Sequence, residues 1–250
     1  MKISVLMENT ARPGFAAEHG LSLLVETRGQ TVLFDMGQTG AFAGNAQLLG
    51  IDLAAVDLAV VSHGHYDHGG GLETFLARNR HAPVYVRREA FRPHFHGAKF
   101  IGLDPRLADH PRLVLTEGDL VLPGGLSLVQ GQKHQIDRTL CVSGGQPDDF
   151  CHEQHLLVAE GGRKILFSGC SHRGILNIVD QFRPDVLVGG FHLKEVTDRE
   201  ALEGTARALL AYPTQYYTCH CTGSAQVRVM QEILGDRLGC LSAGDILLEV

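Results

Sequence analysis

The chain of 250 residues is long enough to bury a substantial core, and its composition, 44% hydrophobic and 20% charged, is that of a globular protein. Six cysteines are too few for a disulfide scaffold, and a formal net charge of -6 without a basic block argues against nucleic-acid binding. No apolar run reaches the roughly 18 residues that cross a bilayer, and the first apolar stretch is too short for a signal peptide. We therefore expect a cytoplasmic protein with reduced thiols and with neither a nucleic-acid nor a membrane partner.

Short apolar runs bounded by glycine, proline or aspartate recur along the chain and predict β-strands. They are residues 2–7, 22–27, 31–37, 57–63, 82–88, 112–117, 125–131, 155–161, 163–169, 185–191, 215–221 and 245–250. Helical patterns lie between them at residues 41–50, 71–81, 172–182, 198–212 and 224–239. The segment from Phe91 to Pro111, rich in histidine, proline and glycine, is expected to be a long loop. The pattern predicts an α/β fold with a single domain over residues 1–250, and its two similar halves suit two sheets packed face to face with helices outside.

The stretch VVSHGHYDHGGGL, residues 60–72, places His63, His65, Asp67 and His68 directly after a predicted strand. His63 and His65 would point the same way from an extended chain, and the three glycines that follow allow a tight turn. Neutral imidazoles and carboxylates are the ligands that zinc, iron and manganese accept. Hydrogen-bonding loop residues are the alternative interpretation, but four donors so close together favour a metal site.

SHGHYDHGGGL resembles the His-x-His-x-Asp-His signature of the metallo-β-lactamase superfamily. TVLFDMG resembles the superfamily motif whose aspartate, here Asp35, supports the metal-binding loop, KILFSG resembles the strand before the bridging ligand, and TCHCTG supplies a final histidine, His220. The order of AEHGLSLLVE, HEQHLLV, SGCSHRGILN, GGFHL and CHCTG is similar to a narrower branch, that of proteins like the 7,8-dihydropterin-6-yl-methyl-4-(β-D-ribofuranosyl)aminobenzene 5'-phosphate synthase of methanopterin biosynthesis. The resemblance covers residues 5–250 and implies a four-layer αββα sandwich of metallo-β-lactamase type, with metals at one edge between the sheets.

The resemblance also implies two metal sites, with the following ligands: His63, His65 and a later histidine for one, and Asp67, His68 and His220 for the other. Where most members of the superfamily carry a bridging aspartate, this chain has Cys170, a softer ligand that favours zinc or iron. A buried reduced cysteine is the alternative at that position. His172 is favoured as the later histidine because imidazole binds every candidate metal.

Further residues are candidates for contacts behind the ligands or with a substrate: Asp35, Glu18, His19, His152, Glu153 and His192. His152 stands where relatives commonly carry an aspartate before the Glu-Gln pair, and it could coordinate a metal or donate a proton. The remaining histidines of interest are expected in surface or hydrogen-bonded roles: His94, His96, His110, His134 and His155.

Two divalent metals would supply a hydroxide nucleophile near neutral pH and polarise the bond under attack, while Asp67 could orient the nucleophile and take its proton. We therefore expect a metal-dependent hydrolase that acts on a phosphoester or ester-type small molecule with one or two divalent transition-metal ions, zinc first and iron or manganese as alternatives. A transferase that joins a pterin diphosphate to a ribofuranosyl-aminobenzene phosphate is the second hypothesis. A non-catalytic metal-binding or redox-sensing protein, suggested by Cys170, Cys219 and Cys221, is the third.

Overall fold

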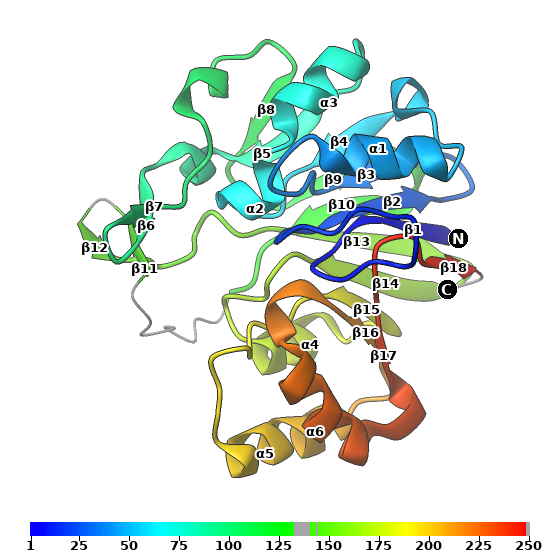
Figure 1. Cartoon of the computed structure of the whole chain (residues 1–250), viewed down its shortest axis with the longest axis vertical. Helices are drawn as coiled ribbons and strands as arrows, with labels where there is room; N and C mark the ends of the chain where they lie inside the picture. Colours follow the sequence, from blue (N-terminus) through cyan, green and yellow to red (C-terminus); the bar gives the residue numbers. More distant parts are fainter. Residues whose placement is uncertain (133–140, 144, 249–250) are drawn as a thin grey trace.

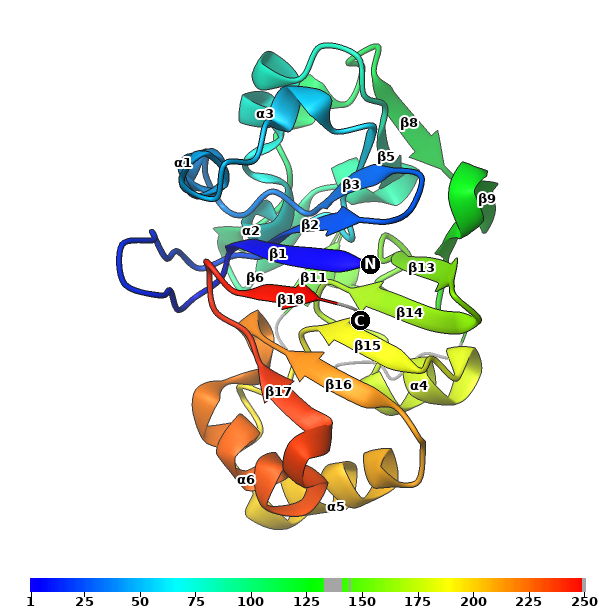
Figure 2. The ribbon, with the colours of Figure 1, turned by 90° about the vertical axis from the view of Figure 1, so that its right-hand side faces the viewer.

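Two seven-stranded sheets lie face to face at the centre of the molecule, as Figures 1 and 2 show. The computed structural model describes residues 1–132, 141–143 and 145–248. The first sheet has the order β18 (Ile246–Leu248), β1 (Lys2–Met7), β2 (Ser22–Glu26), β3 (Thr31–Phe34), β4 (Leu58–Val60), β5 (Val84–Arg87) and β8 (Leu113–Thr116). The second has the order β17 (Leu238–Cys240), β16 (Gln215–Thr218), β15 (Val186–Gly189), β14 (Arg163–Ser168), β13 (His155–Glu160), β10 (Leu126–Val129) and β9 (Leu120–Leu122).

Helices cover the outer face of each sheet and complete the four layers. α1 (Ala41–Leu48) and α3 (Leu72–Arg78) cover the first sheet, and α4 (Ile175–Phe182), α5 (Arg199–Leu210) and α6 (Ser224–Leu234) cover the second. The one-turn helix α2 (Tyr66–Gly69) lies beside the first sheet. None of the helices in the described chain has the length and apolarity needed to span a membrane. The predicted αββα sandwich is confirmed.

Apolar side chains alternate with the strand period and fill the space between the sheets. Phe34 at the end of β3 meets Phe167 of β14, with 6.0 Å between their ring centroids. Two further buried clusters join each sheet to its own helices. This packing holds the ends of β3 and β14 against each other, and the turns that follow both strands carry predicted site residues.

Two predictions about elements are wrong. The segment from Phe91 to Pro111 is not one long loop, because it contains β6 (His94–His96) and β7 (Lys99–Phe100). With β11 (Cys141–Ser143) and β12 (Gln146–Pro147) they form a small sheet of the order β12-β11-β6-β7, in which β6 pairs with β11. The helix predicted over residues 224–239 ends at Leu234, where Gly235 takes a φ of 54°, and β17 follows.

The role expected for His155 is also wrong, because this residue is neither at the surface nor hydrogen-bonded within the described chain. It is fully buried in β13, with its ring 5.9 Å from that of Phe182. Burial, helped by the positive charge of Arg173, lowers the pKa of His155 to about 3. His134, which was assigned to the same class, lies outside the described residues.

His155 should therefore reduce stability in acid. The unfolded chain takes up a proton at this position below its ordinary pKa of about 6.5, whereas the folded chain stays neutral down to about 3, so stability falls as the pH drops between these values. At pH 4.5 the contribution is about 2–3 kcal/mol. His155→Leu should flatten the fall in the free energy of unfolding between pH 6.5 and 4, measured by urea titration at each pH. His81→Gln, on an exposed histidine, should follow the native curve; a His155→Leu curve parallel to the native one would contradict the assignment.

Candidate metal centre

The predicted ligands lie where parallel strands of both sheets end. β3 and β4 are parallel neighbours in the first sheet, and β14, β15 and β16 are parallel neighbours in the second. The carboxyl ends of such strands are the usual place for a binding site in an α/β fold. The turns after them carry Asp35, residues 63–68, residues 170–172, His192 and His220. Both halves of the chain therefore contribute side chains to one site.

Asp35, at the end of β3, is a fully buried carboxylate that organises the first half of this site. Its Oδ1 accepts a hydrogen bond of 2.7 Å from the backbone N–H of Ser62. Its Oδ2 accepts one of 2.7 Å from the Ser62 hydroxyl and one of 2.6 Å from Nδ1 of His68. Three donors thus satisfy a charge that would otherwise be costly to bury.

These hydrogen bonds assign the tautomer of His63. Because the Ser62 hydroxyl gives its only proton to Asp35, it must accept the 2.9 Å hydrogen bond that joins it to Nδ1 of His63. Nδ1 of His63 therefore carries the proton, and its Nε2 has a free lone pair. That lone pair faces the interior of the site, 3.1 Å from Nδ1 of His65.

His68 is oriented by the same carboxylate. Its Nδ1 donates to Asp35, so Nε2 faces the opposite way, 3.2 Å from Sγ of Cys170. Burial by itself lowers the pKa of His68, but the charge and hydrogen bond of Asp35 outweigh it and raise that pKa to about 9. Asp35 therefore favours a positive charge at the outer nitrogen of His68, and either a proton or a metal ion can supply it.

His63, His65 and His172 form a buried group of converging imidazoles. Nε2 of His172 lies 3.3 Å from Nε2 of His63, which is itself 3.1 Å from Nδ1 of His65. Burial and the neighbouring histidines lower the pKa of all three well below the ordinary value, so the rings are neutral. Nitrogens bound to one zinc ion at about 2.0–2.1 Å in tetrahedral geometry are about 3.3 Å apart. The spacing, the neutral rings and the inward lone pair of His63 fit a transition-metal ion.

A second group gathers at Asp67. Nε2 of His19 and Nε2 of His220 each lie 3.2 Å from Oδ2 of Asp67. Burial raises the pKa of this carboxyl, but the two histidines outweigh burial and leave that pKa well below its usual value. The structure thus brings Asp67 and His220 together as predicted, and adds His19 to them. His68 instead lies beside Cys170.

Cys170 and Cys221 face each other across the end of the second sheet. Sγ of Cys221 lies 3.6 Å from the carbonyl oxygen of Cys170 and accepts a hydrogen bond of 3.2 Å from the backbone N–H of His192. Burial and the nearby Cys221 raise the pKa of the Cys170 thiol well above its ordinary value. Without a bound cation this cysteine is therefore a neutral thiol, and its contact with His68 places it at the wall of the site.

Residues His152, Glu153 and Gln154, just before β13, join the turns of the two halves. Glu153 accepts hydrogen bonds from the backbone N–H of His172 at 2.8 Å and of Arg173 at 3.1 Å. Gln154 donates from its backbone N–H to the carbonyl of Ser62 at 2.7 Å. The predicted role of Glu153 behind the ligands agrees with this geometry, since it holds the His172 turn without facing the pocket.

His152 is hydrogen-bonded to the turn that carries His63, His65 and Asp67. Its Nδ1 accepts the Gly64 backbone N–H at 2.8 Å, so its proton is on Nε2, which lies 3.3 Å from Oδ2 of Asp148. His94 donates from Nδ1 to the same oxygen at 2.8 Å. A metal ion on Nε2 would require His152 to lose that proton and become an imidazolate, so the geometry favours a positioning role over coordination. The sequence interpretation missed Asp148, which no motif marks.

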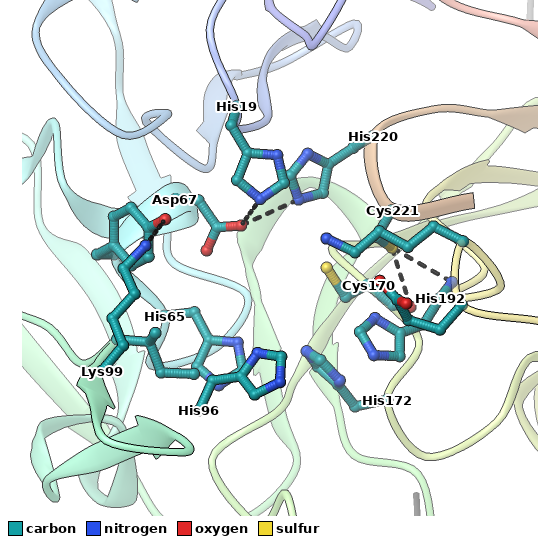
Figure 3. A pocket seen from close by; sticks show the side chains of 14 residues that line it. His19, His65, Asp67, His96, Lys99, Cys170, His172, His192, His220 and Cys221 are labelled. Carbon is teal, nitrogen blue, oxygen red and sulfur yellow. Dashed lines mark hydrogen bonds and ion pairs between the residues drawn. The ribbon is translucent and has the colours of Figure 1, made fainter. Parts of the chain in front are cut away.

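Glu18 does not face the pocket. Its Oε1 accepts hydrogen bonds of 3.0 Å from the backbone N–H groups of Gln38 and Thr39, and its Oε2 accepts one of 2.6 Å from the Thr39 hydroxyl. Glu18 therefore fastens the segment between β1 and β2, and His19 projects from that segment toward Asp67 (Figure 3).

A pocket of about 540 Å³ opens in front of these groups (Figure 3). His65, Asp67, Cys170, His172 and His220 line its inner part. His96, which was expected in a surface or hydrogen-bonded role, also lines the pocket. Three further lining residues were not singled out from the sequence: Lys99, Lys194 and Glu195. Lys99 donates to the Tyr66 hydroxyl at 3.0 Å, which holds its ammonium group beside the pocket. His96 and Lys99 belong to the small sheet, so the failure to predict β6 and β7 also hid this wall.

Backbone strain gathers around the same turns. Asp35, Ser171, His192 and His220 take φ values of 59°, 58°, 52° and 49°, a region that residues other than glycine rarely occupy. Each lies within the turn after a strand that ends at the site. Such strain persists only where surrounding contacts impose it, and it is concentrated at functional sites.

Comparison with known proteins identifies the family. The family model of the metallo-beta-lactamase superfamily matches residues 17–135. The chain is similar to the solved structure of Tm1679, a metal-dependent hydrolase of the beta-lactamase superfamily, with a TM-score of 0.87 and 30% identity over 100% of this chain and 99% of the other. The chain belongs to the metallo-β-lactamase superfamily.

Two relatives come from Methanocaldococcus jannaschii. The uncharacterized protein MJ0448 is 30% identical over 220 residues, which is 78% of this chain and 81% of the relative. The 7,8-dihydropterin-6-methyl-4-(beta-D-ribofuranosyl)-aminobenzene-5'-phosphate synthase is 27% identical over 286 aligned positions, covering 99% of this chain and 96% of the synthase. The resemblance to this branch is thereby confirmed.

Replacing Asp35 by asparagine should weaken metal binding. An amide presents an N–H group where the carboxylate accepts hydrogen bonds, so either Ser62 or His68 must turn away. We expect the affinity for Zn²⁺ to fall about 10- to 100-fold, as for other partners that orient a ligand. Competition with a chromogenic chelator measures this. Asp57→Asn, an exposed carboxylate that accepts from the backbone N–H of Thr31, is the control. Equal affinity of the two variants would refute the role given to Asp35.

Proposed function

We propose that the protein is a metal-dependent hydrolase that cleaves a phosphoester or ester-type bond in a small anionic molecule. The observation that carries the proposal is the convergence of neutral imidazole nitrogens, a carboxylate and a thiol on one pocket, with the tautomers of His63 and His68 assigned by Asp35. The similarity to a metal-dependent hydrolase over the whole chain supports it.

The proposed ligand sets combine the groups described above with the resemblance to the superfamily. His63, His65 and His172, which form one group, would hold one ion. The other ion would be held by Asp67 and His220, which lie together, and by His68, with Cys170 beside His68 as a further donor. Imidazole, carboxylate and thiolate together suit zinc, with iron or manganese as alternatives. When bound, such ions lower the pKa of water toward neutrality and polarise the bond under attack.

Asp67 is the proposed catalytic residue. Both imidazole contacts of this carboxylate use Oδ2, and His19 and His220 keep its pKa low, so it stays ionised. Oδ1 is then able to accept a hydrogen bond from an attacking water molecule and to orient it. Its position on the pocket wall leaves room for a substrate in front of it.

Two lysines support an anionic substrate. Lys99 and Lys194 both line the pocket, and Lys99 is fixed by its hydrogen bond to Tyr66. Phosphate and carboxylate groups are recognised by ammonium groups of this kind. A pocket of about 540 Å³ also has the size of an ordinary small-molecule site.

A transferase is the second candidate. One observation favours it, the match to a pterin-linked phosphate synthase across 99% of this chain. A transferase would consume a pterin diphosphate only when a ribofuranosyl-aminobenzene phosphate is present, whereas a hydrolase needs water alone. Release of diphosphate in reactions with and without the second substrate separates the two hypotheses.

Replacing His65 by alanine should remove most of the bound metal and the hydrolytic activity. We expect the rate of hydrolysis on a panel of phosphodiesters, esters and lactams to fall more than about a hundredfold. Replacing a residue that orients a ligand lowers metal affinity or activity about 10- to 100-fold, and replacing the ligand itself should lower activity further. Metal content is measured by mass spectrometry of the purified protein. His81→Ala, an exposed histidine, should keep both metal and activity. Chelator-treated protein that hydrolyses as fast as untreated protein would refute the proposal.

Removing either lysine should weaken an anionic substrate selectively. For Lys99→Ala and Lys194→Ala we expect KM for p-nitrophenyl phosphate to rise about three- to fivefold, since an exposed charge pair contributes up to about 1 kcal/mol. KM for the neutral p-nitrophenyl acetate should stay unchanged. Lys164→Ala, at the start of β14 and therefore at the end away from the site, should leave KM for both substrates unchanged. Equal effects on both substrates would exclude a charge-specific role.

A further inference from the structure

We infer that His19 is an additional ligand of the ion held by Asp67 and His220, so that this ion takes an imidazole from the segment between β1 and β2. The inference rests on the proposed metal-dependent function and adds a residue that the carried-over ligand set does not include. The three donors are one of the groups in the described chain whose ligand atoms all lie within 4.8 Å of one another.

The geometry at Asp67 is that of ligands around one centre. The two Nε2 atoms of His19 and His220 approach the same oxygen, each at 3.2 Å, and the ring centroids are 4.7 Å apart (Figure 3). Charge-assisted hydrogen bonds between an imidazolium and a carboxylate are shorter, about 2.7–2.9 Å. Donor atoms that share a tetrahedral ion lie about 3.3 Å apart. Both contacts match the second spacing.

Hydrogen bonds to Asn9 leave Nε2 of His220 facing Asp67. Asn9 donates from Nδ2 to the carbonyl of His220 at 3.1 Å and accepts the Gly20 backbone N–H on Oδ1 at 3.3 Å, which assigns its amide orientation. Oδ1 of Asn9 therefore also accepts the 2.8 Å hydrogen bond from Nδ1 of His220. Nε2, the remaining nitrogen of the ring, is directed at Oδ2 of Asp67 at 3.2 Å. Either a proton or a metal ion must lie between these two atoms, and a metal ion there would bind both.

His19 is built onto the turn that carries Asp67. The neighbouring Leu21 donates from its backbone N–H to the carbonyl of Asp67 at 3.2 Å. A Cβ atom added to Gly20 would lie 2.6 Å from that same carbonyl oxygen, so only glycine allows the two segments to approach this closely. Glu18 fastens the other side of His19 through Gln38 and Thr39. The position of His19 is therefore fixed by its flanking residues, although its side chain is 39% exposed.

His96 provides a matched comparison. It is another histidine on the pocket wall with an exposed side chain, but it belongs to none of the metal-capable groups of the described residues. If removing any imidazole from the pocket wall weakens metal binding, His19→Ala and His96→Ala should lose metal affinity equally. If His19 is a ligand, only His19→Ala should lose metal affinity.

The test is a Co²⁺ titration of the metal-free full chain, followed by visible absorption and by calorimetry. We expect the native protein and His96→Ala to bind two ions, and His19→Ala to bind the first normally and the second at least tenfold more weakly. Circular dichroism checks that each variant is folded. Unchanged affinity of His19→Ala for the second ion would overturn the inference, and so would a native protein that binds only one ion.

A cysteine variant gives a direct spectroscopic readout. In His19→Cys, the second equivalent of Co²⁺ should add sulfur-to-cobalt charge-transfer absorption beyond that of the native protein, whereas His96→Cys should add none. Absence of this extra band in His19→Cys would also count against the inference. Failure of the proposed function looks different, because the native protein would then bind no ion at all or would hydrolyse equally well after chelation.

Discussion

The site depends first on the buried carboxylate of Asp35. It accepts two hydrogen bonds from Ser62 and one from His68, and each of these partners transmits an orientation further into the site. Through the Ser62 hydroxyl it turns the free lone pair of His63 inward, and through Nδ1 of His68 it turns Nε2 toward Cys170. A buried charge with fewer donors would be costly, and a neutral group of the same shape could not impose both tautomers. Because a φ of 59° at Asp35 makes this arrangement locally strained, the sheet packing around Phe34 has to hold it in place.

The second constraint is that three of the donors come from the other sheet: Cys170, His172 and His220. Packing between the sheets aligns the ends of β3 and β14, but packing alone does not fix a donor atom to within a few tenths of an ångström. Hydrogen bonds from Glu153 to the His172 turn and from Gln154 to Ser62 connect the two halves directly. Asp148 adds to this by holding the proton of His152 on Nε2, which leaves Nδ1 to accept the Gly64 N–H. The segment before β13 thus positions both turns that carry proposed ligands without supplying a proposed ligand itself.

The sequence predicts the features that depend on residues close together in the chain. It misses the features that depend on contacts between residues far apart in the chain. The cluster of His63, His65, Asp67 and His68 is contiguous, and the buried strands are apolar runs of ordinary length, so both were predictable from local patterns. β6 and β7 were missed because they are only three and two residues long, and because β6 pairs with β11, more than forty residues further on, while β7 pairs only with β6. β17 was hidden because a helical pattern continues past Gly235, where a backbone turn ends the helix. The approach of His19 to Asp67 likewise depends on contacts of Gly20 and Leu21 with a turn far along the chain.

The proposed metal ligands and the outer wall of the pocket belong to different segments of the chain. Membership of the superfamily therefore indicates the type of chemistry more firmly than it indicates the identity of the substrate. Most donor residues sit in turns directly after strands, where the sheets and the contacts of Asp35 and Glu153 fix them. Lys99 and His96 instead come from the small sheet, and Lys194 follows β15 by several residues on an exposed turn. Substitutions in these outer segments alter the charge and shape in front of Asp67 without moving an inner donor. Under the proposed function, hydrolysis and group transfer would share one set of metal ligands and would differ in what the wall of the pocket admits.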